Sequence, residues 1–205
     1  MIAGTARHEG QRRLCASSSR QLTASLHQRI LRTLKARGDE VIDFDLYAMQ
    51  FDPVMGEDEW RGHEDPSRPP PQDLKIYVDA LKWAEACVFC FPTWWVGLPA
   101  ILKGYFDRVW RPGIAFEQPP GGGLIKPALV NLTRMGVVTT CGAPWFYNRL
   151  LMQDPARKVL LRGLKATCGG LGVKQLYLAQ HSVYDISPEA REKFAQKVEQ
   201  RFARF

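Results

Sequence analysis

Two adjacent tryptophans, Trp94 and Trp95, are the residues of this chain best suited to chemistry on a planar ligand. They follow the apolar run 86–91, which is typical of a strand buried on both faces and which Pro92 ends, since proline cannot donate to a sheet ladder. A glycine and a proline a few residues later mark a helix start. Open α/β sheets bind ligands at such turns, beyond the carboxyl ends of their strands. We therefore expect an indole wall for a flat ligand, with one of the two rings packed in the core.

A second turn of the same kind follows a predicted strand at 135–140. Small residues come directly after it, and Cys141 and Gly142 would let backbone amides approach a ligand closely. The aromatic residues Trp145 and Tyr147 lie just beyond. Two ligand-facing turns are thus predicted at the ends of two strands.

The elements that must position these turns alternate along the chain. Apolar spacing predicts helices at 22–35, 73–84, 100–110, 155–168 and 188–202, and strands at 40–46, 86–91, 135–140 and 173–179. This alternation indicates one three-layer α/β domain over 1–205 with a parallel sheet, in which the first 21 residues are atypical. The polar, proline-rich residues 61–72 are expected to be a loop. For residues 47–60, one interpretation is a plain surface loop with apolar anchors such as Phe51 and Trp60.

Composition limits the remaining classes of function. The chain carries 28 Lys and Arg and 21 Asp and Glu, a formal net charge of +7, but these residues are scattered, so nucleic acid is not an expected partner. No apolar run approaches the roughly 20 residues that span a bilayer, and no apolar segment of a signal peptide is evident. We expect a cytoplasmic protein without membrane insertion.

Cysteine and histidine spacing predicts no metal site. Cys87 and Cys90 form a C-x-x-C pattern, but inside a predicted strand, where positions three apart face opposite sides. We interpret them as buried thiols rather than a redox pair.

The stretch FPTWWVGLPAILKGYFDRVWRPGIAFE, residues 91–117, closely resembles the signature of the flavodoxin-like NAD(P)H:quinone reductase family. That family includes quinone-oxidoreductase-type flavoenzymes, the bacterial modulator of drug activity and the ancillary subunits of potassium-efflux systems. The similarity extends, less strongly, from about residue 22 to about residue 202. It includes residues 47–60, YAMQFDPVMGEDEW, which resemble the connection that follows the second strand in the family and for which the plain surface loop is the alternative. It implies a flavodoxin-like three-layer sandwich with a parallel five-stranded sheet of order 2-1-3-4-5. It also implies bound FAD or FMN, NAD(P)H as co-substrate, and a homodimer.

The resemblance further implies which residues meet the flavin and the substrate. Flavin wall and edge contacts would come from Pro92, Thr93, Trp94, Trp95 and Val96, and the opposite edge from Thr139, Thr140, Cys141 and Gly142. Tyr147 stands where the family has a tyrosine that hydrogen-bonds near the flavin carbonyls and aids proton balance; a core tyrosine is the alternative. The histidine that partners this tyrosine in some members falls near Gln153. Substrate contacts would come from Trp145 and from Phe116 and Gln118, which lie in a long loop at 111–129 that crosses to the partner subunit.

The N-terminus departs from the family pattern. In this sheet order the first strand is central, and it would occupy 9–15, where Arg12 and Arg13 would place a charge on each face. Phosphate contacts would come from Ser17, Ser18, Ser19 and Arg20, just before Leu22 and Thr23 at the helix start. A disordered polar leader is the alternative. We predict that the first strand is irregular or displaced and that flavin is held weakly.

The function implied is a two-electron transfer from NAD(P)H to a quinone or a similar planar acceptor by a ping-pong hydride mechanism. An azo- or nitro-reductase would use the same flavin chemistry. The sequence is also compatible with a regulatory subunit of a potassium-efflux system, which would have a peripheral membrane partner, and with a flavin-free paralogue.

Overall fold

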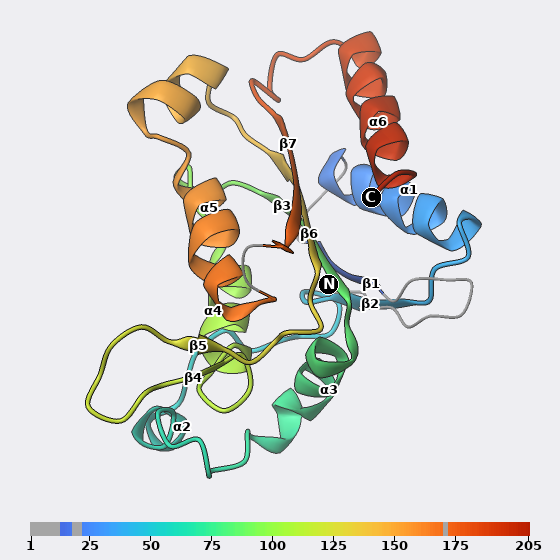
Figure 1. The fold of residues 1–205 in the computed structure, drawn as a ribbon. Helices are drawn as coiled ribbons and strands as arrows, with labels where there is room; N and C mark the ends of the chain where they lie inside the picture. Colours follow the sequence, from blue (N-terminus) through green and yellow to red (C-terminus); the bar gives the residue numbers. More distant parts are fainter. Residues whose placement is uncertain (1–12, 18–21, 170–171) are drawn as a thin grey trace.

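The computed structural model describes residues 13–17, 22–169 and 172–205. Its main sheet has four parallel strands, β1 (Arg13–Ser17), β3 (Ala86–Pro92), β6 (Arg134–Thr140) and β7 (Lys174–Gln180), in the order β1-β3-β6-β7 (Figure 1). Both central strands, β3 and β6, are almost wholly buried, as expected of strands covered on two faces. Cys87 and Cys90 are buried in β3 and form no disulfide, which confirms their interpretation as buried thiols.

The first strand ends later than the sequence predicts. β1 pairs regularly with β3 from Arg13 opposite Ala86 to Ser17 opposite Cys90. It therefore continues past the predicted end at Cys15, and its regular ladder shows that the prediction of an irregular strand is wrong for these residues. Residues 9–12, where the strand is predicted to begin, lie outside the described residues. Arg12, Ser18, Ser19 and Arg20, for which charge burial and phosphate contacts are predicted, lie outside the described residues.

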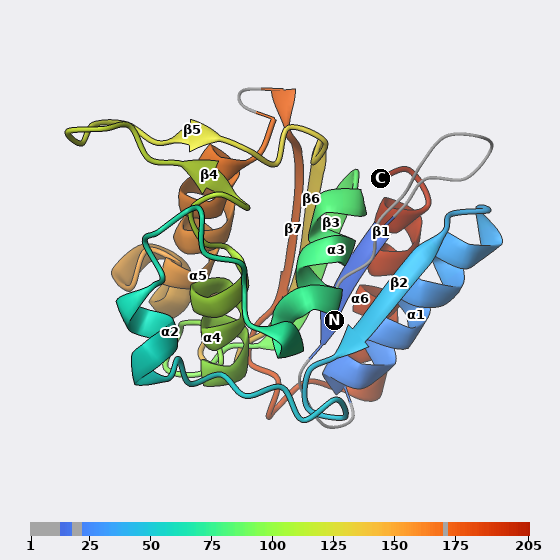
Figure 2. The ribbon, with the colours of Figure 1, turned by 90° about the horizontal axis from the view of Figure 1, so that it is seen from below.

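A further strand, β2 (Val41–Asp45), lies alongside β1 at the edge opposite β7 (Figure 2). This is the position that the predicted order gives to the second strand. The described hydrogen-bond register covers four strands, so the complete five-strand order remains a prediction.

Helices cover both faces of the sheet, which gives three layers. α1 (Leu22–Ala36) and α6 (Pro188–Phe202) lie on one face, and α3 (Lys75–Trp83), α4 (Ala100–Val109) and α5 (Pro155–Lys158) lie on the other (Figure 2). Apolar residues at helical spacing, such as Leu26, Ile30 and Leu34 in α1, are fully buried. No described helix is both long enough and apolar enough to cross a membrane.

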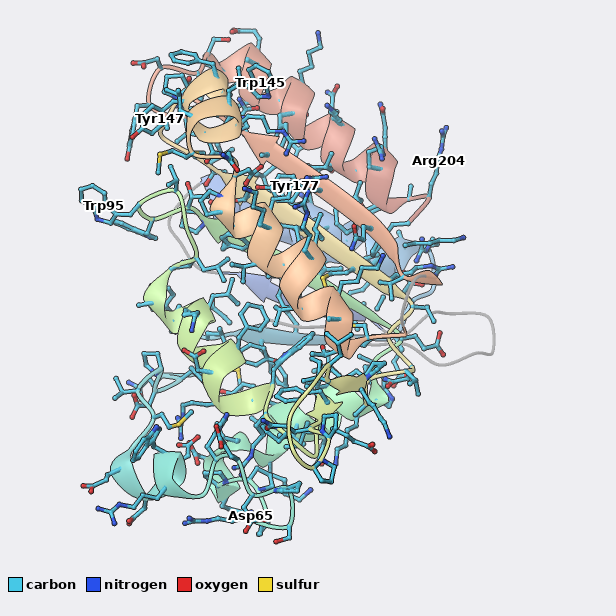
Figure 3. All side chains as sticks on the ribbon, turned by 60° about the vertical axis from the view of Figure 1, so that its left-hand side comes forward. Asp65, Trp95, Trp145, Tyr147, Tyr177 and Arg204 are labelled. Atoms are coloured by element: carbon cyan, nitrogen blue, oxygen red, sulfur yellow. The ribbon has the colours of Figure 1, made fainter. Side chains whose placement is uncertain are left out.

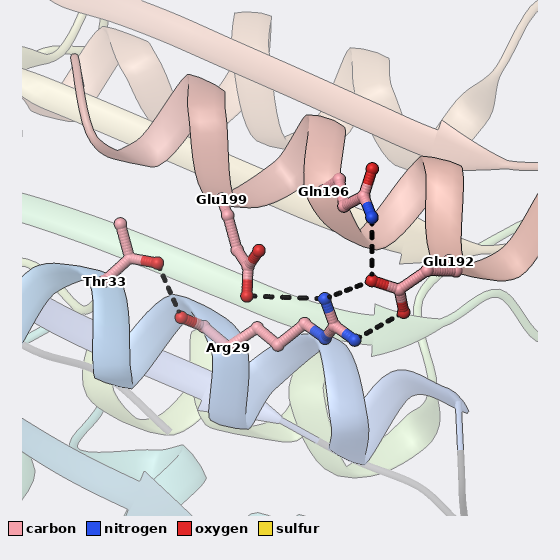
Figure 4. Close-up of polar contacts among 5 residues, drawn as sticks. All are labelled: Arg29, Thr33, Glu192, Gln196 and Glu199. Carbon is pink, nitrogen blue, oxygen red and sulfur yellow. Dashed lines mark hydrogen bonds and ion pairs between the residues drawn. The ribbon is translucent and has the colours of Figure 1, made fainter.

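An ion pair joins α1 to α6. Arg29 donates to both carboxylate oxygens of Glu192, at 3.0 and 2.5 Å, and reaches Glu199 at 3.4 Å (Figure 4). Gln196 donates to Glu192 at 3.1 Å, and the Thr33 hydroxyl donates to the Arg29 carbonyl at 2.8 Å. The helices of the first and last quarters of the chain are thus fixed to each other.

The segment before α3 is more ordered than a plain loop. It contains the short helix α2 (Glu57–Arg61) and a 3₁₀ turn, Gln72–Leu74. Phe51 anchors it as predicted, whereas Trp60 is 68% exposed and anchors nothing. Its real anchor is the buried Arg108 of α4, which donates to Glu59 at 2.9 Å and to Asp73 at 3.0 Å.

Two more segments differ from the predictions. The long loop 111–129 holds a short antiparallel pair, β4 (Phe116–Glu117) and β5 (Lys126–Pro127). The helix predicted at 155–168 is broken into α5, a π-helical turn Val159–Gly163 and a 3₁₀ turn Leu164–Thr167. Gly163 lies at the break, where the weak helix preference of glycine permits the change.

Candidate active site

The two predicted turns meet because β3 and β6 are paired to their ends. Pro92 lies opposite Thr140 in the register. Just beyond, the Thr93 amide donates to the Thr140 carbonyl at 2.8 Å, and its hydroxyl reaches the same oxygen at 3.3 Å. The turn after β3 is therefore hydrogen-bonded directly to the end of β6.

The start of α1 forms a third side of the candidate site, next to the joined ends of β3 and β6. The hydroxyl oxygens of Thr23 and Thr140 lie 2.9 Å apart, and both residues are buried. The neighbouring hydroxyl of Thr139 is buried and has no hydrogen-bond partner among the described residues. Successive side chains of a strand point to opposite faces, so the Thr139 hydroxyl lies on the face of β6 away from the Thr23–Thr140 contact.

A cavity of about 570 Å³ opens between these elements and the start of α6, and we call it the α1–α6 cavity. Ligand pockets commonly enclose about 300–1,000 Å³. Four predicted cofactor residues line the cavity: Leu22, Thr23, Pro92 and Thr140. The sequence did not indicate the other eight lining residues, which include Ser25, Tyr184, Arg191 and Glu192.

The turn 94–97 is a tight hairpin in an unusual conformation. Trp94 and Gly97 exchange two backbone hydrogen bonds, at 3.1 and 2.9 Å. Trp95 and Val96 between them have φ of 49° and 55°. Positive φ at both central residues is the pattern of a type I′ turn, which asparagine and glycine normally occupy. An L-residue in this region costs about 1–2 kcal/mol, so the turn is strained, as is common at functional sites.

Both indoles of this turn face solvent. Trp94 is 61% exposed and Trp95 is 96% exposed. The expectation that one of them packs in the core is wrong, because the two-residue turn projects its side chains away from the sheet. The amides of Trp95 and Val96 have no backbone partner in the described part of the chain, whereas those of Thr93 and Trp94 are engaged. The turn thus offers a flat aromatic surface beside available amide donors.

The turn after β6 is less open than the sequence suggests. The Cys141 amide donates to the Gln180 carbonyl at 2.7 Å and so continues the sheet. A side chain at Gly142 would collide with the Tyr184 ring, whose nearest carbon would lie 2.4 Å from the added Cβ. The small residue at 142 therefore accommodates Tyr184, which lines the α1–α6 cavity.

Tyr147 begins a π-helical turn, Tyr147–Leu151, and is 42% exposed, so it is not a core tyrosine. π-helical turns are frequent at functional sites. Gln153, where a partner histidine is expected, instead accepts a hydrogen bond from Lys158 at 2.6 Å. The histidine near this turn is His181, whose Nε2 lies 3.3 Å from the amide nitrogen of buried Asn148. Burial lowers the pKa of His181, and Arg149 lowers it further against the opposing effect of Asp154.

The predicted substrate residues are not brought together within one chain. Phe116 and Gln118 belong to the β4–β5 region at the lower left of Figure 1, whereas the segment carrying Tyr147 lies at the upper left. Trp145 lines a different cavity, beside β7.

Three residues that sequence reasoning missed follow the end of β7 or begin α6: His181, Tyr184 and Arg191. They lie at the same carboxyl edge of the sheet as the two predicted turns. The rule that ligands bind beyond strand ends would have indicated the first two, had it been applied to the last strand.

Comparison with known proteins gives consistent matches. A family model described as a flavodoxin-like fold matches residues 14–204. An uncharacterized NAD(P)H oxidoreductase of Haemophilus influenzae is 29% identical over 187 residues, which are 89% of this chain and 90% of that protein. NAD(P)H dehydrogenase (quinone) 1 of Rattus norvegicus is 32% identical over 107 residues, 45% of this chain and 39% of the rat protein.

Two solved structures extend the comparison. Smu.1420 from Streptococcus mutans superposes with a TM-score of 0.80 at 26% identity, covering 93% of this chain and 98% of that one. An FMN-dependent NADH-azoreductase from Bacillus anthracis, in complex with FMN, gives a TM-score of 0.70 at 15% identity, covering 93% and 96%. The second likeness shows a shared fold.

Proposed function

Because the chain belongs to the flavodoxin-like fold family, we propose that it is a flavin-dependent NAD(P)H oxidoreductase that transfers two electrons to a quinone or a similar planar acceptor. The single observation that carries this proposal is the strained turn 94–97, which displays Trp95 beside the joined ends of β3 and β6. The names of the relatives support it, since they include NAD(P)H oxidoreductases and an NAD(P)H dehydrogenase (quinone). An FMN-bound azoreductase shares the fold.

The residues present fit a flavin. The α1–α6 cavity has the volume of a ligand pocket, and its lining includes the hydroxyl groups of Thr23 and Thr140 and the cation Arg191. Thr23 and Thr140 would meet the polar part of the cofactor, while Trp95 and its turn would form the wall for the ring. Free amides at 95 and 96 would meet the ring edge.

A bound flavin would supply the two-electron chemistry between NAD(P)H and the acceptor, which we propose to be ping-pong. Trp95 offers an exposed flat surface that orients planar ligands. Tyr147, half-exposed on the neighbouring π-helical turn, supplies a hydroxyl that holds or moves a proton at its Oη atom.

We also propose a homodimer whose partner completes the site. Phe116 and Gln118 lie far from Tyr147 in the same chain, so their predicted substrate contacts would be made in the partner's site. A cluster of exposed apolar side chains beside Tyr147 supports a protein interface there: Phe146, Leu150, Leu151 and Met152. Sedimentation as a monomer at micromolar concentration, with full activity, would contradict this.

The test is the protein as purified. We expect a yellow protein that oxidises NADPH or NADH with menadione as acceptor, and chromatography of the released cofactor identifies FMN or FAD. Flavin lost on dialysis would agree with the weak binding predicted from the N-terminus, and flavin retained in stoichiometric amount would contradict it. A colourless protein that does not take up added flavin would refute the enzyme, and a yellow protein without turnover would favour a regulatory subunit.

A further inference from the structure

A second cavity, of about 630 Å³, lies at the open edge of the sheet between β7, α5 and α6, and we call it the β7-edge cavity. Figure 3 shows Trp145 at its upper end and Tyr177 below, beside α5. Apolar side chains, Leu161, Leu178 and Phe194, also line it. The proposed flavin chemistry uses none of this cavity except Trp145.

The only carboxylate that lines this cavity among the described residues is already engaged by the protein. Asp154 is buried, and its Oδ1 accepts from the Tyr177 hydroxyl at 2.8 Å and from the Arg157 amide at 3.3 Å. Its Oδ2 accepts from Arg149 at 3.3 Å. Its charge is therefore compensated by Arg149, and both of its oxygens are already engaged by the protein.

Two further cations line the cavity, and neither is paired with a carboxylate among the described residues. The Arg157 guanidinium lies over the Tyr177 ring, 5.7 Å from its centroid, and makes no ion pair in the described part of the chain. Lys197 of α6 has cations one helical turn away on both sides, Lys193 and Arg201. With three cations and one carboxylate in its lining, the cavity carries a net charge of +2 when His181 is neutral.

The distribution of charge along the chain agrees with this. Residues 1–133 hold 16 Lys and Arg and 16 Asp and Glu, so they are balanced. Residues 134–205 hold 12 Lys and Arg and 5 Asp and Glu, so their net charge of 12 − 5 = +7 equals the net charge of the whole protein. The elements around the β7-edge cavity thus carry the field that would attract an anion.

We propose that the β7-edge cavity binds a phosphorylated nucleotide, with a phosphate monoester held by Arg157 and Lys197 and the base against Trp145. A phosphate alone would leave most of the volume unfilled, while Trp145, 55% exposed, offers a face for a ring. Arginine and lysine are the usual phosphate ligands. The phosphate has two sources, a free nucleotide or the 2′-phosphate end of NADPH, and the second rests on the proposed function.

The test is calorimetric titration of the full-length protein with adenosine 2′,5′-bisphosphate, with adenosine as the ligand that lacks phosphate. We expect binding of the bisphosphate and at least about tenfold weaker binding of adenosine. Lys197→Gln should weaken the bisphosphate about tenfold, and Lys197→Arg should restore most of the affinity. Lys197 is exposed, so neither variant should unfold the protein.

Lys193→Gln is the matched control, because it removes the same charge one turn away and outside the lining. Absence of heat with millimolar bisphosphate, or equal weakening by Lys193→Gln, would overturn the proposal. Steady-state kinetics then distinguish the two sources of the phosphate. If Lys197→Gln raises KM for NADPH but not for NADH, the ligand is the 2′-phosphate end of NADPH. If both KM values stay unchanged while the bisphosphate weakens, the ligand is a free nucleotide. Calorimetry needs no turnover, so a failure of the proposed function would not affect it.

Discussion

The hydroxyl oxygens of Thr23 and Thr140 lie 2.9 Å apart, although 117 residues separate them in sequence. One begins α1 and the other ends β6, so this contact fixes the helix start against the carboxyl edge of the sheet. The candidate flavin site depends on that arrangement, because the α1–α6 cavity lies between the same two elements.

We expect Thr140→Val and Thr23→Val each to lower the free energy of unfolding by about 1–3 kcal/mol, because each leaves a buried hydroxyl without a partner. The double variant should cost less than the sum, since valine at both positions leaves no hydroxyl unsatisfied. Denaturant titration of the four proteins measures this coupling. Strict additivity would show that the contact contributes nothing.

Val96→Gly should raise the free energy of unfolding by about 0.5–1 kcal/mol. Glycine removes a left-handed strain of about 1–2 kcal/mol, and part of this gain is offset by the greater freedom of the unfolded chain. Val54→Gly is the control, because Val54 is exposed and does not have positive φ. That change should lower stability, and a similar fall in both variants would show that the turn is not strained.

Trp95→Ala should weaken flavin binding by about 1–3 kcal/mol while the melting temperature of the flavin-free protein stays nearly unchanged. The reason is that an indole 96% exposed contributes little to the core. Trp60→Ala, which removes another exposed indole, serves as control and should leave flavin binding unchanged. Fluorescence titration of the two apoprotein variants with FMN and FAD measures their flavin affinity, and thermal denaturation of the apoproteins measures the melting temperature. A large loss of melting temperature with unchanged affinity would return Trp95 to a structural role.

Tyr147→Phe should reduce turnover with menadione about 100-fold or more, because it removes a hydroxyl proposed to move a proton. The absorption spectrum of bound flavin should remain as in the unaltered protein. Tyr47→Phe, at another exposed tyrosine, should leave turnover unchanged. Equal turnover of the two variants would remove Tyr147 from the mechanism.

Burial raises the pKa of the Cys168 thiol from 9.0 to about 11. Below pH 9 the thiol is protonated in both the folded and the unfolded state, so it does not make the free energy of unfolding depend on pH. Between about pH 9 and 11 the unfolded thiol ionises first, so stability falls by up to roughly 3 kcal/mol as pH rises. Cys168→Ala lacks this contribution, so its deficit relative to the unaltered protein should shrink over that range. Denaturation curves at pH 8, 9 and 10.5 test it, and parallel pH profiles would contradict it.

Periodicity and apolar runs were enough to predict most of the fold. The runs ending at Phe91 and Thr140 predicted β3 and β6 within one residue, because strands buried on both faces must be continuously apolar. The prediction of one continuous helix at 155–168 was wrong. The spacing of apolar residues does not reveal a local change in backbone hydrogen-bond pattern such as the one near Gly163.

The site was harder to predict, for two physical reasons. Nothing in a tryptophan-valine pair signals positive φ, so the type I′ turn and the exposure of both indoles are visible only in the structure. The space above Gly142 is filled by Tyr184, and the position of Tyr184 depends on how the chain turns after β7. Local pattern indicated which turns form the site, but contacts between distant residues decide which atoms remain open to a ligand.

The pairing of Arg29 with Glu192 has a consequence for biosynthesis. These residues are 163 positions apart, so at about 5–20 residues per second the ribosome needs roughly 10–30 s after making α1 before α6 can cover it. During that interval the face of α1 that carries Arg29 has no partner helix on the nascent chain. The contact between the first and last helices therefore forms only when synthesis of the chain is nearly finished.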